Sequence, residues 1–306
     1  MGWYMLLFRA SIKLRNHRIG KIIYNILESA GIRIAVSRFA NWRTACYNER
    51  HPNEQMRKSR IFYKQNADRV RKVIKLLQDE ESKDVFKNMI RFRCFSRYRQ
   101  LPHNAVRTQY FGNDFFTYDA KEVFVDCGAY DGDSVQAFKK IMKKKRLGGG
   151  YRIVAFEPDQ QSYRNLMRNH PDITGIQAGV WKENGYLAFH PQGCVTSVFE
   201  EANKVQTGQA GELAGIQVPV RSIDQTYECR DATFIKMDIE GSEYYAIKGA
   251  KTVICKNKPK LAICIYHSDQ DMLRLIEMIH EMVPDYRFYI RQHSNTIYET
   301  VLYAVC

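Results

Sequence analysis

Two glycines and several acids follow a short apolar run at residues 123–134, which read Val-Phe-Val-Asp-Cys-Gly-Ala-Tyr-Asp-Gly-Asp-Ser. The apolar residues predict a strand that Asp126 closes. Gly128 and Gly132 then let the turn pass close to a ligand before a helix begins. The spacing lacks the G-x-G-x-x-G that a dinucleotide pyrophosphate needs. An acid at the strand end repels phosphate and suits a ligand with an amino group, such as S-adenosylmethionine. The alternative is an ordinary strand-to-helix turn.

A second acid, Glu157, follows the next strand-like run, at residues 152–156. In doubly wound folds, an acid at the tip of the second strand binds the ribose hydroxyls. Glu157 comes later than the ~20 residues usual after such a glycine turn. The lysine- and glycine-rich segment 139–150 accounts for the extra length. We therefore predict that Glu157 binds a ribose, the alternative being a solvated surface acid.

A third informative run lies at residues 234–243, which read Phe-Ile-Lys-Met-Asp-Ile-Glu-Gly-Ser-Glu. Its apolar part predicts a buried strand that delivers Asp238 and Glu240 to its carboxyl end. Gly241 makes a turn, and Ser242 begins a helix in the manner of a cap. In an open parallel sheet, this end is where ligands bind.

Together, the Asp126 loop, Glu157-Pro158 and the run 234–243 resemble the FkbM family of S-adenosylmethionine-dependent methyltransferases. The resemblance covers residues 123–305 and includes flanking motifs of the same order and spacing. These motifs are Lys248-Gly249-Ala250, Lys258-Pro259 before 261–267, and 289–291 before 299–303. The chain departs from the family at Arg291-Gln292-His293, where an Arg-His-type ending is common.

The resemblance implies a Rossmann-like class I methyltransferase with an α/β fold, a mostly parallel sheet and a closing antiparallel strand pair. It implies O-methylation of a sugar, glycan or related metabolite, with S-adenosylmethionine as cofactor. It also implies residue roles. By position, Asp126, Gly128 and Gly132 would hold the methionine part, and Glu157 would bind the ribose. Ala178 and Gly179 would border the adenine, and Asp238 and Glu240 would face the sulfonium and the acceptor. Tyr130 and Asp238 are also counted among the cofactor-binding residues.

Methyl transfer to a hydroxyl needs an aligned acceptor and a base that removes its proton. His267 ends the predicted strand 260–266 at the rim where substrates bind, and histidine titrates near neutral pH, so it is the first candidate. Its alternative role is a structural hydrogen bond. Asp238 and Glu240 are second candidates, and His293, in a predicted turn, is a weaker one. These residues give the predicted catalytic set of His267, Asp238 and Glu240.

A metal requirement, as in catechol-type methyltransferases, is not expected from this sequence. Hard cations need several oxygen ligands. Asp238 and Glu240 supply two acids, and no further convergent set is visible. We therefore predict no metal ligands.

The net positive charge of the chain lies in its first third. Residues 1–118 hold 24 Lys and Arg against 9 Asp and Glu, while the whole 306-residue chain has a net charge of +14. This asymmetry predicts a basic helical region at 1–118 and the methyltransferase domain at 119–306. Helical apolar spacing at 3–30, 66–77 and 82–95 predicts a helical cap. The alternative is docking to an anionic membrane surface or a polyanionic substrate.

From residue 123 onward, predicted strands and helices alternate. Strands are expected at 173–178, 186–189, 197–199, 216–220, 233–237 and 260–266, and a closing antiparallel pair at 287–291 and 300–305. Helices are expected at 160–169, 242–248 and 269–283. This alternation predicts a mostly parallel sheet.

The sequence predicts a cytoplasmic protein, with peripheral contact at the inner face of the cell membrane as an option. No apolar run approaches the ~18 residues of a membrane span, and the N-terminus does not resemble a signal peptide. The eight cysteines form no C-x-x-C pair and are expected to be reduced.

Two other functions compete with O-methylation of a small molecule or glycan. The basic first third suggests an RNA methyltransferase, although no known RNA-binding module is present and nucleic acid is not the expected partner. A non-catalytic partner protein could keep the fold for binding alone, but the intact set of Asp126, Glu157, Asp238 and Glu240 argues against it.

Overall fold

A computed structural model describes residues 50–95, 109–192, 196–201, 216–294 and 298–306. The predicted helix at 3–30 lies outside these residues. The chain divides into two compact units, one of residues 1–61 and 90–99 and the other of residues 62–89 and 100–306. The larger unit carries the sheets and all the predicted site residues.

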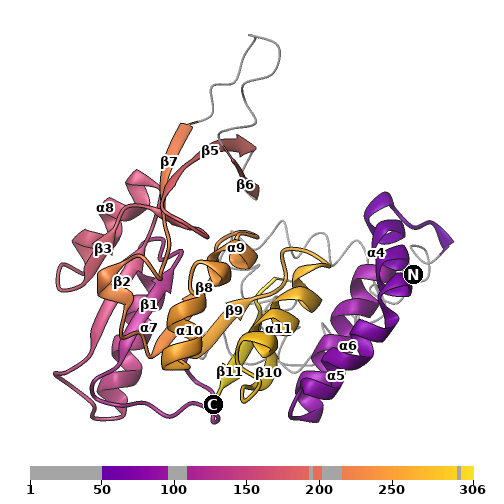
Figure 1. The fold of residues 1–306 in the computed structure, drawn as a ribbon, viewed down its shortest axis with the longest axis horizontal. Helices are drawn as coiled ribbons and strands as arrows, with labels where there is room; N and C mark the ends of the chain where they lie inside the picture. Colours follow the sequence, from indigo (N-terminus) through magenta and orange to yellow (C-terminus); the bar gives the residue numbers. More distant parts are fainter. Residues whose placement is uncertain (1–49, 96–108, 193–195, 202–215, 295–297) are drawn as a thin grey trace, which may run out of the picture. The chain divides into compact units, whose positions relative to one another are not determined.

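The main sheet of the larger unit has seven strands and is mostly parallel, as predicted (Figure 1). Only β11 runs antiparallel to its neighbours β10 and β9. In spatial order the strands are β10 (Arg287–Gln292), β11 (Thr300–Val305), β9 (Lys260–Cys264), β8 (Phe234–Met237), β1 (Val123–Cys127), β2 (Arg152–Phe156) and β3 (Thr174–Ile176). The central strands β1 and β8 are buried throughout, which explains why they are apolar except for Asp126 and Lys236.

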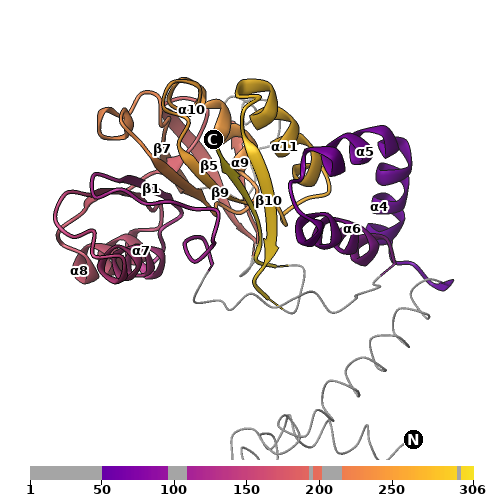
Figure 2. The ribbon, with the colours of Figure 1, turned by 90° about the horizontal axis from the view of Figure 1, so that it is seen from below.

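Helices cover both faces of this sheet. Figure 2 shows α7 (Asp133–Lys144) and α8 (Gln160–Asn169) on one face, and α9 (Glu243–Lys248), α10 (Lys251–Asn257) and α11 (Asp271–Met282) on the other. The start of α8 is capped by Asp159, whose side chain accepts a hydrogen bond from the Ser162 amide. Parallel strands with helices between them place the strands' carboxyl ends along one edge.

The predicted strands at 186–189, 197–199 and 216–220 lie in a second, four-stranded sheet. Its order is β4 (Gly179–Val180), β7 (Ile216–Arg221), β5 (Gly185–Gln192) and β6 (Thr196–Glu201). A short 3-10 turn, η4 (Tyr227–Cys229), then leads to β8. The sequence analysis predicts strands at the positions of β5, β6 and β7, but it predicts neither β4 nor a separate sheet.

The N-terminal described helices are α4 (Glu54–Gln65), α5 (Ala67–Leu76) and α6 (Glu80–Phe95). The sequence predicts α5 and α6 but not α4. Within the larger unit, residues 77–82 cover the outer strand β10. The Gln78 amide donates to the Phe288 carbonyl, and the Arg291 guanidinium binds the Asp79 carboxylate at 2.6 Å.

Aromatic residues just before β1 complete the core of the larger unit. Tyr110, Phe111 and Phe116 are buried and pack in one cluster with Phe124 and Phe234 of the central strands. The compact unit therefore includes residues before the predicted division at 118. An accessory role for residues 1–118 stays a prediction. Among the described helices, none combines the length and the apolar character needed to cross a bilayer.

Candidate functional site

The glycine loop between β1 and α7 has a backbone conformation that residues other than glycine disfavour. Gly128 and Gly132 have φ values of 79° and 93°, in the left-handed region. A Cβ on Gly128 would lie 2.1 Å from the Asp238 carbonyl oxygen, and one on Gly132 would lie 2.3 Å from the His170 ring. The glycine loop therefore touches the backbone that ends β8, so the two predicted sites adjoin.

Asp126 is enclosed beneath this loop. Its carboxylate has no exposed surface, accepts a hydrogen bond from Ser134, and lies 3.1 Å from the Lys236 ammonium. Lys236 also donates to the Gly128 carbonyl oxygen at 2.8 Å. The structure thus makes Asp126 part of the loop's support. Its predicted direct contact with the methionine part stays a prediction.

Glu157 joins the ends of β1 and β2. Its Oε2 accepts a hydrogen bond from the Tyr130 amide at 2.8 Å, and its Oε1 accepts one from the Asp159 amide at 2.9 Å. Burial raises the pKa of Glu157, while these two amides act to lower it. Each oxygen keeps a second lone pair that a ribose hydroxyl could use. Tyr130 itself has a positive φ and is 64% exposed.

Ala178 and Gly179 lie one strand further along the sheet edge. They follow the carboxyl end of β3, and both are buried. The Ala178 amide donates to the Ile176 carbonyl, so this turn is fixed by its own backbone. Their contact with the adenine of the cofactor through backbone groups stays a prediction.

Asp238 directly follows β8 and is held by two tyrosines. Tyr110 donates to Oδ2 at 3.1 Å and Tyr266 donates to Oδ1 at 3.0 Å. Burial alone would raise the pKa of this carboxyl, but His267, Lys236 and Tyr266 hold the pKa well below its usual range. Asp238 is therefore ionised and fixed in orientation.

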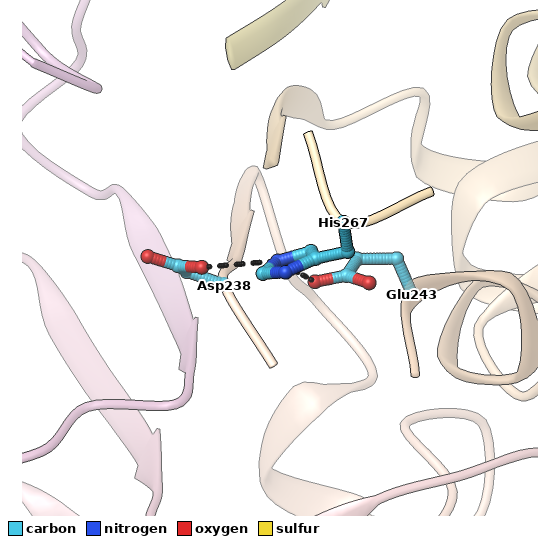
Figure 3. A group of neighbouring side chains, drawn as sticks. All are labelled: Asp238, Glu243 and His267. Atoms are coloured by element: carbon cyan, nitrogen blue, oxygen red, sulfur yellow. Dashed lines mark ion pairs between the residues drawn. The ribbon is translucent and has the colours of Figure 1, made fainter. Parts of the chain in front are cut away.

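His267 lies between two carboxylates (Figure 3). Its Nε2 is 3.4 Å from Asp238 Oδ1 and 3.2 Å from Oε1 of Glu243, the first residue of α9. Glu243 is fully buried, and its Oε1 also accepts a hydrogen bond from the Ile239 amide at 2.9 Å. Asp238, Glu243 and His267 are called the acid–histidine cluster below.

The cluster changes the protonation of its histidine. Burial would lower the pKa of His267, but the carboxylates of Asp238 and Glu243 outweigh it and raise the pKa to about 10. In the absence of a bound cation, the ring is thus protonated at neutral pH and cannot accept a further proton. The sequence predicts a histidine near neutral pKa, and the difference arises because Glu243 returns to the strand end.

Glu240 occupies the rim of the same site. It has a φ of 55°, its side chain is half exposed, and its Oε2 is 3.7 Å from His267 Nδ1. Burial raises its pKa, and the negative charges of Asp238, Glu243 and Glu299 add to this rise against the opposing effect of His267. His293, the weaker candidate base, is instead buried, with its Nε2 2.8 Å from the Tyr303 hydroxyl.

The predicted residues thus form two adjoining groups. The glycine loop, Glu157 and the turn at 178–179 follow β1, β2 and β3, while the acid–histidine cluster and Glu240 follow β8 and β9. Sequence reasoning missed four contributors, Tyr110, Lys236, Glu243 and Tyr266. Lys236, Glu243 and Tyr266 lie within the motifs at 234–243 and 261–267, so their position in these motifs could have identified them. Tyr110 has no such signal.

Comparison with known proteins identifies the type of domain. Residues 126–294, more than half of the chain, match the model of the methyltransferase FkbM domain. The chain is similar to the structure of methyltransferase FkbM from Methylobacillus flagellatus. The identity is 27%, the TM-score is 0.65, and the match covers 80% of this chain and 60% of that chain. The chain thus spans less than two thirds of that protein.

Two other solved structures are more distant. An rRNA methylase from Streptococcus thermophilus is 10% identical, with a TM-score of 0.36 over 61% of this chain and 87% of that chain. The Aeropyrum pernix fibrillarin, solved with bound S-adenosyl-L-methionine, is 11% identical, with a TM-score of 0.35 over 61% of this chain and 67% of that chain. These scores are too low to support a functional comparison. No curated protein matches the chain.

Proposed function

Because the chain belongs to the FkbM family of S-adenosylmethionine-dependent methyltransferases, we propose that it transfers the methyl group to a hydroxyl oxygen of a sugar, glycan or related metabolite. One observation supports this most directly. The glycine loop contacts the backbone of Asp238, so a cofactor bound on the loop would have its methyl group beside the acid–histidine cluster. Aligned displacement requires such adjacency.

The cofactor would be held by the glycine loop and Glu157. The exposed Tyr130, whose amide binds Glu157, would also contact the cofactor. Glu157 would accept hydrogen bonds from the ribose hydroxyls, and the turn at 178–179 would border the adenine through its backbone. The buried pair of Lys236 and Asp126 would keep the loop in its shape.

The acceptor hydroxyl would lie over the acid–histidine cluster, where the carboxylates can accept its hydrogen bond. In the displacement, the hydroxyl oxygen bonds to the methyl carbon, the carbon–sulfur bond breaks, and the hydroxyl proton leaves. His267, Asp238 and Glu240 are the groups that we propose to receive it. His267 can do so only after losing the proton that the neighbouring carboxylates hold on it.

Turnover with defined acceptors tests this function. The full-length chain is incubated with S-adenosylmethionine and a panel of monosaccharides, nucleotide sugars and oligosaccharides, and S-adenosylhomocysteine is quantified. We expect product with at least one acceptor class, and a new O-methyl resonance in its NMR spectrum. Transfer to RNA, with none to any saccharide, would replace this proposal with the RNA alternative. Cofactor binding without transfer to any acceptor would favour a non-catalytic role.

A further inference from the structure

The acid–histidine cluster has the composition and spacing of a metal-binding site. Asp238, Glu243 and His267 each offer one ligand atom, and these atoms all lie within 4.8 Å of one another. We infer that these three side chains bind one divalent transition-metal cation, with Zn²⁺ the best fit. The binding of the ion is inferred independently of the proposed function, whereas a catalytic role for the ion rests on it.

Two buried atoms of the cluster lack hydrogen bonds. His267 Nε2 points between the carboxylates in Figure 3, yet it makes no hydrogen bond of regular geometry, and its side chain is only 9% exposed. Oε2 of the fully buried Glu243 also has no hydrogen-bond partner. Leaving such atoms unsatisfied is costly. A cation bound between the two side chains would give the imidazole nitrogen a partner and would compensate the negative charge of the whole Glu243 carboxylate.

The two spacings between His267 Nε2 and the carboxylate oxygens match tetrahedral coordination. Zn²⁺ binds histidine nitrogen and carboxylate oxygen at about 2.0–2.2 Å, which sets neighbouring ligand atoms about 3.4 Å apart in a tetrahedron. Nε2 lies 3.4 Å from Asp238 Oδ1 and 3.2 Å from Glu243 Oε1. Three protein ligands leave a fourth position for water or substrate, as in catalytic zinc sites.

Neighbouring groups hold the ligand side chains in place by hydrogen bonds, as is usual for metal ligands. The Tyr110 and Tyr266 hydroxyls fix the Asp238 carboxylate, and the Ile239 amide fixes that of Glu243. Nδ1 of the histidine faces the Glu240 carboxylate at 3.7 Å. With a hydrogen on Nδ1 on that side, Nε2 is the nitrogen that would release its proton and bind the ion.

The local charge favours a cation. Asp238 and Glu243 bring two carboxylates to the cluster, and the nearby Lys236 ammonium is engaged by Asp126 and the Gly128 carbonyl. Mixed imidazole and carboxylate ligands suit zinc better than magnesium. The sequence alone predicts no metal because only Asp238 and Glu240 were visible as candidate ligands. In the folded chain, Glu243 and His267 lie beside Asp238, while Glu240 lies at the rim.

Occupancy would give the cluster a defined task. A zinc ion with an open position lowers the pKa of a bound hydroxyl and holds its oxygen in place. His267 would then serve as a ligand, and its role as the base would pass to another group. The cofactor's sulfonium cannot replace the ion at Nε2 because it does not bind a nitrogen lone pair.

Metal titration of the full-length protein tests the inference without any need for turnover. Chelator-treated protein is titrated with Zn²⁺ by calorimetry, and Co²⁺ is added separately to record its visible spectrum. We expect one saturable site and an intense four-coordinate Co²⁺ spectrum. Glu243→Gln and His267→Ala should each weaken binding at least about tenfold, since a direct ligand matters at least as much as its support.

Two controls exclude surface binding. Asp285→Asn removes an exposed carboxylate that pairs with Lys258, and a Cys255→Ser/Cys306→Ser variant removes the two exposed thiols among the described cysteines. Both should bind Zn²⁺ as the wild type does. Circular dichroism confirms that each variant is folded, and the two ligand variants are independent, so loss of one to misfolding leaves the other informative.

The outcomes separate the two proposals. Absence of a saturable site in the wild type, or binding that survives both ligand substitutions, overturns the metal site. If S-adenosylhomocysteine still binds in that case, the methyltransferase proposal stands. Conversely, a zinc site in a chain that transfers no methyl group would retain this inference and reject the proposed function.

Discussion

Lys236 and Asp126 form an ion pair between the two central strands of the sheet, with 3.1 Å between Nζ and Oδ1 and almost no exposed surface on either side chain. The two residues are direct neighbours in the parallel pairing of β1 and β8. Because Lys236 also binds the Gly128 carbonyl, the pair connects the sheet interior to the glycine loop.

Breaking this pair should strongly destabilise the fold. Lys236→Met leaves a buried carboxylate without its counter-charge, which costs about 3–5 kcal/mol. Urea unfolding followed by circular dichroism measures the loss. The exposed pair Lys258–Asp285 provides the control, and Lys258→Met should leave the midpoint nearly unchanged. A Lys236→Met midpoint equal to the wild type would show that the pair does not hold the fold.

Glu157 should contribute directly to cofactor affinity. Glu157→Ala removes charge-assisted hydrogen bonds to ribose and should weaken S-adenosylhomocysteine binding by about 1–3 kcal/mol in calorimetry. NAD should not bind comparably. Burial raises the pKa of Glu157, and only the ionised form accepts strongly, so affinity should fall as the pH drops through that pKa. Wild-type binding of NAD alone would contradict the assignment.

The two tyrosines on Asp238 should matter for turnover more than for cofactor binding. Tyr266→Phe keeps the ring but removes the hydroxyl that binds Oδ1 at 3.0 Å. A hydrogen bond to a charged group contributes about 1.5–3 kcal/mol, so kcat/KM should fall about tenfold or more. Tyr186→Phe, on an exposed tyrosine of β5, is the matched control. Equal rates for both variants would show that Tyr266 does not position Asp238 for the reaction.

His267 should be essential whether it acts as a base or as a ligand. His267→Ala should lower kcat by about 10²-fold or more while cofactor affinity stays nearly unchanged, because its contribution is made in the transition state. Asp238→Asn should impair both quantities, since Asp238 adjoins the glycine loop. Near-normal turnover of His267→Ala would move the role of base to Glu240, the next residue to substitute.

The basic first third allows a test of membrane contact. If residues 1–118 dock on anionic lipid, co-sedimentation with anionic liposomes should fall as salt rises, because salt screens exposed charge. If they only cap the fold, deletion of residues 1–45 should yield unstable protein with no lipid-specific effect. Equal recovery with neutral and anionic liposomes at low salt would eliminate membrane docking.

The sequence alone predicted much of the fold and the position of both groups of site residues. Continuous apolar runs specify buried parallel strands, and the glycines and acids after them mark the strand ends where a ligand binds. Hence the loop at Asp126, the acid at Glu157 and the acids after β8 were placed correctly along the sheet edge. The helix α8 begins and ends where its pattern predicted, at Gln160 and Asn169.

Only the tertiary structure decided which of these side chains meet. A local pattern does not show which of the two glutamates, Glu240 or Glu243, joins Asp238 beside a histidine from another strand. The turn with positive φ at Glu240 and Gly241 sends Glu240 to the rim and returns Glu243 to His267. The same holds for Tyr110, which reaches Asp238 across 128 residues of sequence. Such contacts depend on the packing of distant segments, and that packing sets the charge of His267 and the identity of the ligands.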